Sequence, residues 1–459
     1  MDLIYSLAEH VVSTNFEALP REVVEKTKLF ALDSLGLAIA GSRAPGVPQV
    51  AELMAELGGK PESTVYYFGH RLTAMDAALM NSMMVHALDF DDIHEEAVVH
   101  PSCVQVPVAF AIAEQCRPVH GKDLIAAMAL GTDLSCRLGL ALKSGTGFLR
   151  TTTCGIYGAV ANAAKLRNCS RDQIVNAMGI AFSQSAGNLQ AVLDGALVKR
   201  MQPGFMAKDG IFSVTLAERG ISGPEATMEG KYGFLELYKR GETYRDRITK
   251  DLGRVYEGIN VTVKPYPAGR FTHGPAEMAI GMANEENLGP EEISEISLYL
   301  NKKANEYVGR PYDPDRGNPQ VMAQFCAAYA VAAGIVRRDL FIGEFEEEVV
   351  KDRAIAGLAS KVRIIVDESF EDPATKTTAG LVIKTRDGRT LSKTVQYPKG
   401  DPNNFLSKEE FTTKFRKCLD HCSPKIREEN IEKVIDLMGR LEDIPDAGNI
   451  PRLLIRQDA

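Results

Sequence analysis

The chain has 459 residues, of which 45% are hydrophobic and 25% are charged, a composition typical of a folded protein with two or three domains. Its net charge of −8 and the lack of any long basic run argue against nucleic acid or an anionic membrane as the main partner. No segment approaches the roughly 18 uncharged apolar residues of a membrane span, and the start of the chain lacks the basic region of a secretory signal. The eight cysteines form no C-x-x-C pair, which indicates reduced thiols and a cytoplasmic location.

The first part of the chain, as far as Val261, reads mainly as helix. PREVVEKTKLFALDSLGLAIAG places Pro20 at a helix start, repeats apolar residues at three- and four-residue spacing, and ends at Gly41. Many of the helical segments are rich in Ala, Gly and Met, which favours close packing and burial on all sides. Further helices are predicted at Val47–Leu57, Ala74–Leu88, Val104–Glu114, Asp123–Leu142, Gly155–Lys165, Arg171–Ser183 and Gly210–Arg219.

After Val261 the pattern changes to short β-branched segments. EISEISLYLN and KVRIIVDES alternate apolar and polar residues, and GLVIKTRDGRTLSKTVQY reads as a hairpin with Asp387-Gly388 at its turn. One helix, NPQVMAQFCAAYAVAAGIVRR, is predicted between the first two strands, and the end of the chain returns to helix. We therefore predict a mainly α fold with an α+β part. A large helical domain (residues 1–259) is completed by the C-terminal helices (399–459), and a smaller α+β domain (260–398) lies between them.

The stretch MMVHALDFDDIHEEAVVHPS gathers histidines and acids at the end of an apolar helix. His86 and Asp89 fall on one helix face, and Pro101 enforces an extended conformation at His100. A helix end that meets a loop carrying a carboxylate and an imidazole suits proton transfer, with one group as base and another as acid. We therefore propose Asp89 and His100 as catalytic residues.

Two other interpretations apply to the same stretch. Asp91 or Asp92 can cap the helix, and we expect Glu95 and Glu96 simply to face water. Histidine and aspartate are also metal ligands. However, the sequence has no H-E-x-x-H, no H-x-H and no second cluster of this kind, so we predict no metal.

Three further segments carry cations, a histidine and a tyrosine. In DGALVKRMQPGFMAKDG, Lys199 and Arg200 precede a Pro-Gly pair and a helix start, where free backbone N–H groups add to their charge and favour an anion. In KPYPAGRFTHGPAEMA, three basic residues flank two prolines at the change from helix to strand, and domain junctions favour ligand sites. These three residues are Lys264, Arg270 and His273.

In NEYVGRPYDP, Tyr307 can donate a proton and Arg310 can grip a carboxylate. For each of these cationic or aromatic residues alone, an ordinary surface or packing role is the alternative. GTGFLRTTTCGIYGAV is glycine-rich but is not a phosphate loop, and the chain has neither a dinucleotide fingerprint nor a nucleophile elbow. Carboxylate, imidazole, phenol and several cations without a cofactor motif suit proton abstraction beside a carboxylate, because cations must hold the resulting anion. The expected substrate is a small di- or tricarboxylate, and no cofactor is expected.

In order along the chain, HALDFDDIHEEAVVHPS, VKRMQPGFMAKDG, KPYPAGRFTH and YVGRPY resemble the MmgE/PrpD family. Members of this family include 2-methylcitrate dehydratase, cis-aconitate decarboxylase and iminodisuccinate epimerase. The resemblance extends over roughly Leu3 to Leu441 and is specific for the family, although not for one member. Motif by motif, it places the family's active-site acid on Asp89, its loop histidine on His100 and its pocket lysine on Lys199.

The resemblance also implies a large all-α domain, a smaller α+β lid and a homodimer. The lysine and histidine of the lid junction fall on Lys264 and His273, and the lid tyrosine falls on Tyr307. One departure matters. Many members carry His-Pro after a Gly-Phe pair, whereas here Gly147-Phe148 is followed by Leu149-Arg150, so an imidazole is missing and a guanidinium is added.

We therefore expect a cofactor-independent lyase, and the first hypothesis is a hydro-lyase of the methylcitrate type. In this hypothesis Asp89 and His100 transfer protons and Tyr307 donates to the leaving group. The carboxylates would be held by Lys199, Arg150, Lys264 and Arg270, with Arg200, Arg310 and His273 also in the site. The alternatives are an epimerase or racemase, which needs no leaving group, a decarboxylase, a polycarboxylate-binding protein that has lost catalysis, and a metal-dependent hydrolase.

Overall fold

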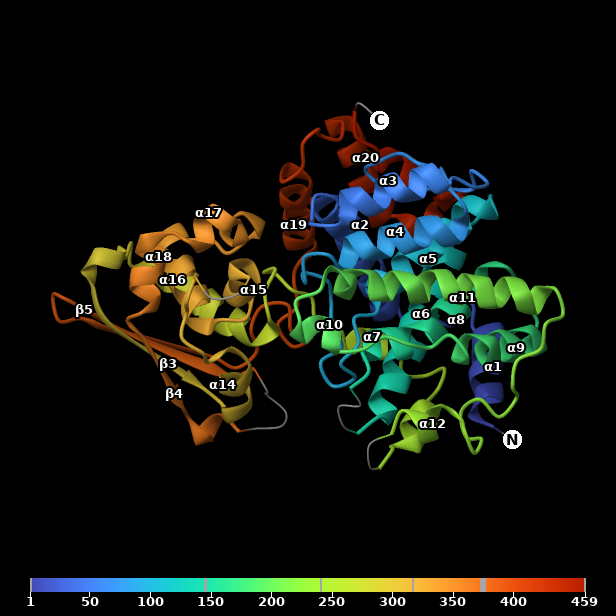
Figure 1. The fold of residues 1–459 in the computed structure, drawn as a ribbon, viewed down its shortest axis with the longest axis horizontal. Coiled ribbons are helices and arrows are strands. Elements are labelled where there is room, and N and C mark those ends of the chain that lie inside the picture. The colour runs from blue at the N-terminus through green and yellow to red at the C-terminus, as the bar shows by residue number, and fades with distance from the viewer. Residues whose placement is uncertain (1, 144–146, 240–241, 316–317, 372–376, 458–459) are drawn as a thin grey trace. The chain divides into compact units, whose positions relative to one another are not determined.

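The computed structural model describes residues 2–143, 147–239, 242–315, 318–371 and 377–457. The chain divides into two compact units, coloured along the chain in Figure 1. Unit 1 comprises Met1–Thr262 and Ser407–Ala459, and unit 2 comprises Val263–Leu406. The chain therefore leaves the first unit, builds the second and returns to the first. The predicted boundaries were 259 and 398.

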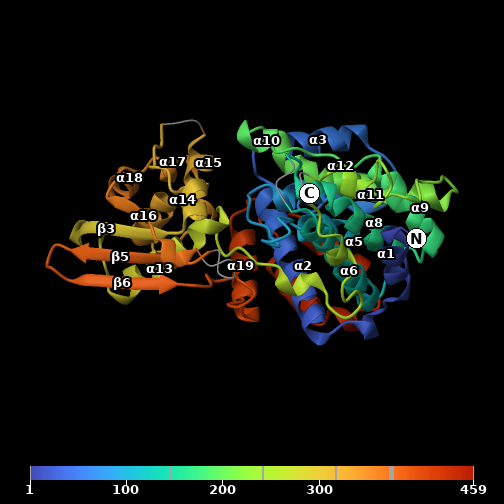
Figure 2. The same ribbon diagram turned by 90° about the horizontal axis from the view of Figure 1, so that it is seen from below.

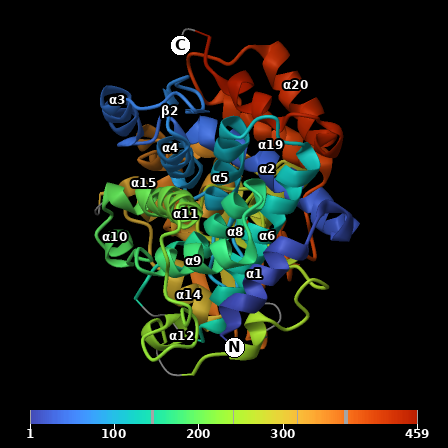
Figure 3. The same cartoon turned by 90° about the vertical axis from the view of Figure 1, so that its right-hand side faces the viewer.

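Unit 1 is helical and confirms the mainly α prediction. Figure 3 shows α4, α5, α8 and α11 packed together, with α2 and α19 beside them. The helices before the second unit are α1 (Leu3–Ser13), α2 (Arg21–Gly41), α3 (Val47–Leu57), α4 (Ala74–His86), α5 (Ser102–Gln115), α6 (Gly121–Ala141), α7 (Arg150–Thr153), α8 (Gly155–Leu166), α9 (Arg171–Phe182), α10 (Gln190–Leu193), α11 (Gln202–Glu218) and α12 (Phe234–Leu237). A short hairpin, β1 (Ser63–Thr64) and β2 (Arg71–Leu72), precedes α4.

The central helices of unit 1 are buried on nearly all sides, which explains why they lack a polar face. Every residue of α5 from Ser102 to Glu114 is buried. Small residues let neighbouring helices approach closely: a Cβ added at Gly158 of α8 would lie 2.3 Å from the carbonyl oxygen of Gly131 on α6. Of the described helices, α6 alone is long and apolar enough to cross a membrane, but its most apolar window is entirely buried. That burial is typical of a core helix.

Helix α11 is longer than predicted, because it starts at Gln202 rather than Gly210. Pro203 lies in its first turn, where proline needs no hydrogen-bonded N–H and its fixed φ suits the helix. Gly204 then lies against α4, where an added Cβ would be 2.6 Å from the carbonyl oxygen of Leu79. The Pro-Gly pair that signals a turn in the sequence is therefore part of the helix.

The C-terminal helices α19 (Lys408–Asp420) and α20 (Glu428–Gly439) complete unit 1. Helix α19 packs against α2, and a Cβ at Gly36 would lie 2.9 Å from the ring of Phe415. Beside this contact, the ammonium Nζ of Lys414 lies 2.7 Å from Oδ1 of Asp33, and both side chains are buried. Lys414 also lies over the ring of Phe90, 4.1 Å from its centroid, so the ion pair extends to the loop after α4.

Unit 2 has one mixed sheet, in the order β4-β3-β5-β6. Figure 2 shows β3, β5 and β6 side by side. The strands are β3 (Ile293–Leu300), β4 (Val362–Val366), β5 (Ala379–Thr385) and β6 (Thr390–Val395). β4 is parallel to β3, whereas the β3–β5 and β5–β6 pairs are antiparallel, with Leu298 opposite Leu381. The predicted hairpin turn is present, with Gly388 at φ 91°.

Helices cover the sheet of unit 2 and form its core. α13 (His273–Glu285) packs on β5 and β6, and α16 (Ala327–Arg337) packs on β4. The remaining helices are α14 (Lys302–Val308), α15 (Pro319–Gln324), α17 (Glu347–Val350) and α18 (Arg353–Ala359). The single helix predicted at 318–338 is broken in two, because Cys326 is extended at φ −128° and the carbonyl of Gln324 accepts the N–H of Gly269.

Candidate active site

The end of α4 places Asp89 beside Lys199. The helix stops at His86, and Asp89 adopts the left-handed conformation with φ 55°, which aspartate tolerates better than most residues. Its Oδ1 accepts a 2.9 Å hydrogen bond from Nζ of Lys199, and both side chains are partly exposed. Lys199 lies in a 3-10 turn, Leu197–Met201, that leads directly into α11. Two of the residues that the sequence singles out therefore form one ion pair.

Asp91 is buried between two histidines. Nδ1 of His86 lies 2.7 Å from Oδ2 of Asp91, and Nδ1 of His100 lies 3.4 Å from the same oxygen. The two imidazole rings meet edge to face, with centroids 5.2 Å apart. Burial alone would raise the pKa of Asp91, but the two histidines outweigh it and hold that pKa well below its ordinary value. Asp91 is therefore a buried carboxylate ion between two histidines rather than the helix cap that the sequence offered as an alternative.

His86 is a neutral histidine at ordinary pH. Its burial lowers its pKa to about 4, although the carboxylate of Asp91 opposes this shift, and the charge of Lys199 lowers the pKa further. The charge of Lys199 thus acts on His86, whose ring contacts that of His100. The acid, the imidazole and the ammonium group that the sequence proposes for catalysis belong to one cluster in unit 1.

The neighbouring acid, Asp92, holds the start of α5. Its carboxylate accepts both the backbone N–H and the hydroxyl of Ser102. Burial raises the pKa of Asp92 to about 7, and the nearby carboxylate Asp91 adds to this shift. The two consecutive acids therefore differ: Asp91 is ionised and faces histidines, whereas Asp92 readily carries a proton and faces a helix terminus.

These opposite shifts predict the pH dependence of stability. The native state keeps a proton on Asp92 between its ordinary pKa of 3.8 and about 7, so this residue makes stability fall as pH rises through that range. Between about pH 4 and 6.5, His86 is protonated to a smaller extent in the native state than in the unfolded state. This residue therefore makes stability rise with pH in that range. Asp92→Asn should therefore make stability rise more steeply between pH 4.5 and 6.5, by up to about 1.4 kcal/mol per pH unit.

Urea unfolding at a series of pH values measures this slope. The matched variant His86→Gln should change the slope in the opposite direction. Equal slopes for Asp92→Asn and the unmodified protein would show that Asp92 is ionised in the folded state.

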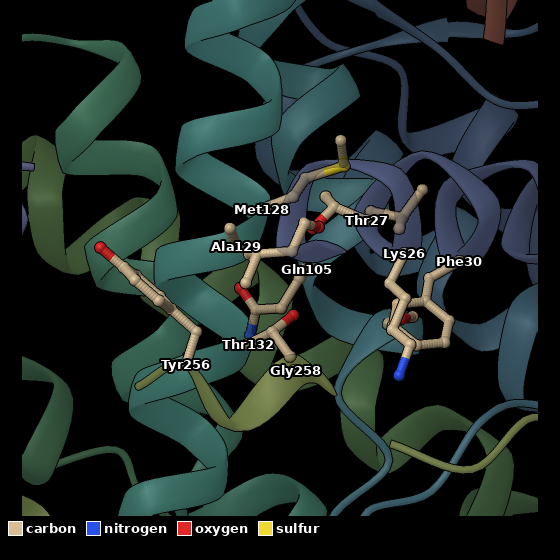
Figure 4. Close-up of a pocket in the computed structure, with 12 residues that line it drawn as sticks. Lys26, Thr27, Phe30, Gln105, Met128, Ala129, Thr132, Tyr256 and Gly258 are labelled. Atoms are coloured by element: carbon tan, nitrogen blue, oxygen red, sulfur yellow. The ribbon is translucent and has the colours of Figure 1, made fainter. Parts of the chain in front are cut away.

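A cavity of about 10 Å³ lies behind the Asp92–Ser102 contact. Figure 4 shows Gln105, Thr132 and Gly258 around it, and Ser102 also lines it. The space fits one water molecule at most, so it is not a substrate pocket. A wider, open depression of about 590 Å³ lies along α1, and no predicted site residue lines it.

One trio of side chains has the chemistry of a metal site. Ligand atoms of His86, Asp91 and Cys103 lie within 4.8 Å of one another. Burial raises the pKa of the Cys103 thiol well above its ordinary value, so the sulfur keeps its proton unless a metal displaces it. His86 and Asp91 already bond each other, so a metal would have to break that contact. The absence of a metal stays a prediction.

The two arginines proposed in unit 1 bind backbone carbonyls. Nη1 of Arg150 donates to the carbonyls of Ala97 and Gly139, at 3.2 Å and 3.1 Å, and its side chain is buried. Arg150 therefore joins the loop after α4 to the end of α6. Nη1 of Arg200 donates to the carbonyl of Pro45 at 2.6 Å. Their proposed contacts with substrate stay predictions. In the motif that contains Arg150, Gly145 and Thr146 lie outside the described residues.

In unit 2, three of the predicted residues lie buried near the start of α13. Nε2 of His273 lies 3.2 Å from the carbonyl of Ala268, and its ring meets that of Tyr266 edge to face. Nη2 of Arg270 lies 3.5 Å from Oδ2 of Asp401. Lys264 is also buried, at 2% exposure. Lys264 and Arg270 are therefore two buried cations in unit 2, close together in the chain.

The other two predicted residues of unit 2 are on its surface. Tyr307 lies on α14 with 57% of its area exposed, and its ring contacts that of Phe271. Arg310 is also exposed and follows the same helix. Of the ten predicted site residues, the structure joins Asp89 to Lys199 directly and places His100 in the cluster around Asp91.

Sequence reasoning missed the roles of His86 and Asp91. His86 entered only as a helix neighbour of Asp89, and Asp91 only as a possible cap. The available signal was the apolar helix itself, because a histidine on a fully buried helix needs a partner and Asp91 follows it by five residues.

Comparison with known proteins matches both parts of the chain to one family. Residues 5–247 match the MmgE/PrpD N-terminal domain and residues 266–439 match the MmgE/PrpD C-terminal domain. The chain belongs to the MmgE/PrpD family. It is 27% identical over 450 residues to cis-aconitate decarboxylase of Aspergillus terreus, covering 93% of this chain and 91% of that protein.

Two further relatives come from other organisms, and one of them is named for another reaction. Cis-aconitate decarboxylase of Mus musculus is 26% identical over 94% of this chain and 89% of its own length. The 2-methylcitrate dehydratase of Salmonella typhimurium is 22% identical over 96% of this chain and 95% of its own length. The similarity therefore spans both units of the chain.

Proposed function

We propose that the protein is a lyase that transfers a proton at a carbon next to a carboxylate of a small di- or tricarboxylate. The observation that carries this proposal is the cluster in unit 1: the Asp89–Lys199 pair, with His100 beside the ionised Asp91. The names of the relatives, which are decarboxylases and dehydratases, support a lyase. The proposal needs neither a metal nor an organic cofactor.

The chemistry divides among these side chains as follows. Removing a proton next to a carboxylate adds one more negative charge to the substrate, and a fixed cation must stabilise it. Lys199 supplies that cation, and Asp89 holds its ammonium group in place. His100 takes the proton through Nε2, and in a dehydration the imidazolium so formed gives a proton to the substrate hydroxyl, which leaves as water.

Dehydration is the first candidate because it needs a base and then an acid, and His100 can serve as both in turn. Decarboxylation is the second, because the decarboxylases are more similar to the chain, at 26–27% identity against 22% for the dehydratase. Leu149 stands where the family resemblance implies a histidine in many members. This chain therefore lacks one imidazole that its relatives could use in either reaction. The family resemblance alone brings five residues of unit 2 into this proposal: Lys264, Arg270, His273, Tyr307 and Arg310.

Proton NMR in deuterated water tests the proposal. The enzyme is added to methylcitrates, citrate, cis-aconitate, iminodisuccinates and tartrates, with and without a chelator. A substrate that loses water gives dehydration, and one that loses carbon dioxide gives decarboxylation. Deuterium exchange with inversion and no loss would mean an epimerase. Binding without any exchange would contradict the proposal that the protein is an enzyme. Activity that disappears with chelator would show that the reaction depends on a metal.

A further inference from the structure

We propose that Asp91, held by His86, is the positioning residue that fixes the tautomer and orientation of His100. It directs the Nδ1–H of His100 toward Asp91 and leaves Nε2 unprotonated to act on substrate. The proposal deepens the proposed function, because it rests on His100 being the base. Asp91 itself does not touch the substrate.

The backbone of His100 is held on both sides. Its N–H donates to Oγ1 of Thr151 at 3.1 Å, and its carbonyl accepts from Sγ of Cys103 at 3.2 Å. Pro101 follows immediately and restricts the backbone of His100 further. The remaining freedom of this residue is rotation of its side chain and the choice of ring nitrogen that carries the proton.

Asp91 lies where it can fix both the orientation of the His100 ring and the ring nitrogen that carries the proton. The ring of His86 meets that of His100 edge to face and so limits how the His100 ring turns. Nδ1 of His100 is buried and makes no hydrogen bond to the described residues in this structure, and Oδ2 of Asp91 lies 3.4 Å from it, as an ion-pair contact that a small rotation of the ring would close to a hydrogen bond. A carboxylate ion can only accept, so the nitrogen that faces it is the one that carries hydrogen. Contacts of this kind often lengthen without substrate and shorten when it binds.

His86 keeps Asp91 in this role. Its Nδ1–H donates to the oxygen that faces His100, and its other nitrogen, Nε2, is buried with no hydrogen-bond partner among the described residues. A buried nitrogen without a partner is unfavourable, so packing alone does not explain a histidine there. Because His86 is neutral, the His86–Asp91 pair retains one negative charge opposite His100.

The first test reads the tautomer directly, in the full-length protein labelled with ¹⁵N-histidine. Nδ1 and Nε2 have different ¹⁵N shifts when protonated and unprotonated, and the His100 signals are those that disappear in His100→Gln. The proposal expects the Nδ1–H form in the unmodified protein and a shift toward the Nε2–H form in Asp91→Asn. An Nε2–H form in the unmodified protein overturns it, even if Asp91→Asn does not fold.

The second test is kinetic. Asp91→Asn should lower kcat by about 10²–10⁴-fold with KM nearly unchanged, because substrate binding is kept while the base presents the wrong nitrogen. The matched control is Asp92→Asn, a change at the next buried acid, which should keep kcat within a few-fold and leave the His100 tautomer as it is. Equal losses in both variants would show a merely structural effect and overturn the proposal.

The two tests separate this inference from the proposed function. If no polycarboxylate reacts but His100 is in the Nδ1–H form and changes in Asp91→Asn, the proposed reaction fails and the positioning by Asp91 stands. If turnover is found but the tautomer is the same in Asp91→Asn, the reaction stands and the positioning fails.

Discussion

Asp89→Asn is expected to lower kcat/KM by about 10²–10³-fold while leaving the fold intact, because Lys199 loses the carboxylate that holds its ammonium group. Asparagine has the same shape and tolerates the left-handed conformation at φ 55°, so the backbone after α4 is kept. The change removes the charge that pairs with Lys199 at 2.9 Å. Because both side chains of that pair are partly exposed, its loss should cost at most about 1 kcal/mol of stability. The large effect should therefore be on catalytic activity and not on stability.

Steady-state kinetics with the substrate found by NMR, together with urea unfolding, measures both parts of this prediction. Glu96→Gln is the matched control in the same loop, since Glu96 is an exposed acid that pairs with Arg247. It should retain nearly full activity. Full activity in Asp89→Asn would remove Asp89 from the mechanism.

Lys414→Ala should destabilise unit 1 by about 3–5 kcal/mol. The substitution leaves the carboxylate of Asp33 buried without its partner, and burial already raises the pKa of that group despite the lysine. It also removes the cation above the ring of Phe90. The double variant Asp33→Leu/Lys414→Met should be far less destabilised, because no charge is then left buried.

Urea unfolding midpoints test this second prediction. Lys408→Ala, on the same helix, is the control: Lys408 pairs with Glu25 at the surface and should cost no more than about 1 kcal/mol. Similar losses for Lys408→Ala and Lys414→Ala would mean that burial of the pair contributes nothing.

Much of the fold follows from local patterns in the sequence. The apolar spacing predicted α3 at its observed bounds, Val47–Leu57, and the Asp-Gly turn predicted the hairpin of β5 and β6. The break between α15 and α16 was missed because it depends on a distant residue, Gly269, which bonds the carbonyl of Gln324. Nothing near Gln324 in the sequence signals that contact.

The candidate site shows the same division. Motifs pointed to Asp89, His100 and Lys199, and the structure joins the first and third of these across 110 positions. The apolar helix that carries His86 signalled a need for a partner, but the two histidine contacts of Asp91 could not be predicted because they exist only after α4 and the loop have folded. For Arg150, the motif predicted a charge that is available to substrate, whereas the fold uses its Nη1 to bind two carbonyls.

The buried Asp33–Lys414 pair joins residues that are 381 positions apart in the chain. A ribosome adds about 5–20 residues per second, so roughly 20–80 s separate the synthesis of the two partners. During that time Asp33 on α2 lacks the cation that pairs with it in the folded protein, and the apolar face of α2 that α19 covers stays exposed. The whole of unit 2 is made in the same interval. The nascent helical unit is therefore expected to be open to chaperones and proteases until the last segment of the chain emerges.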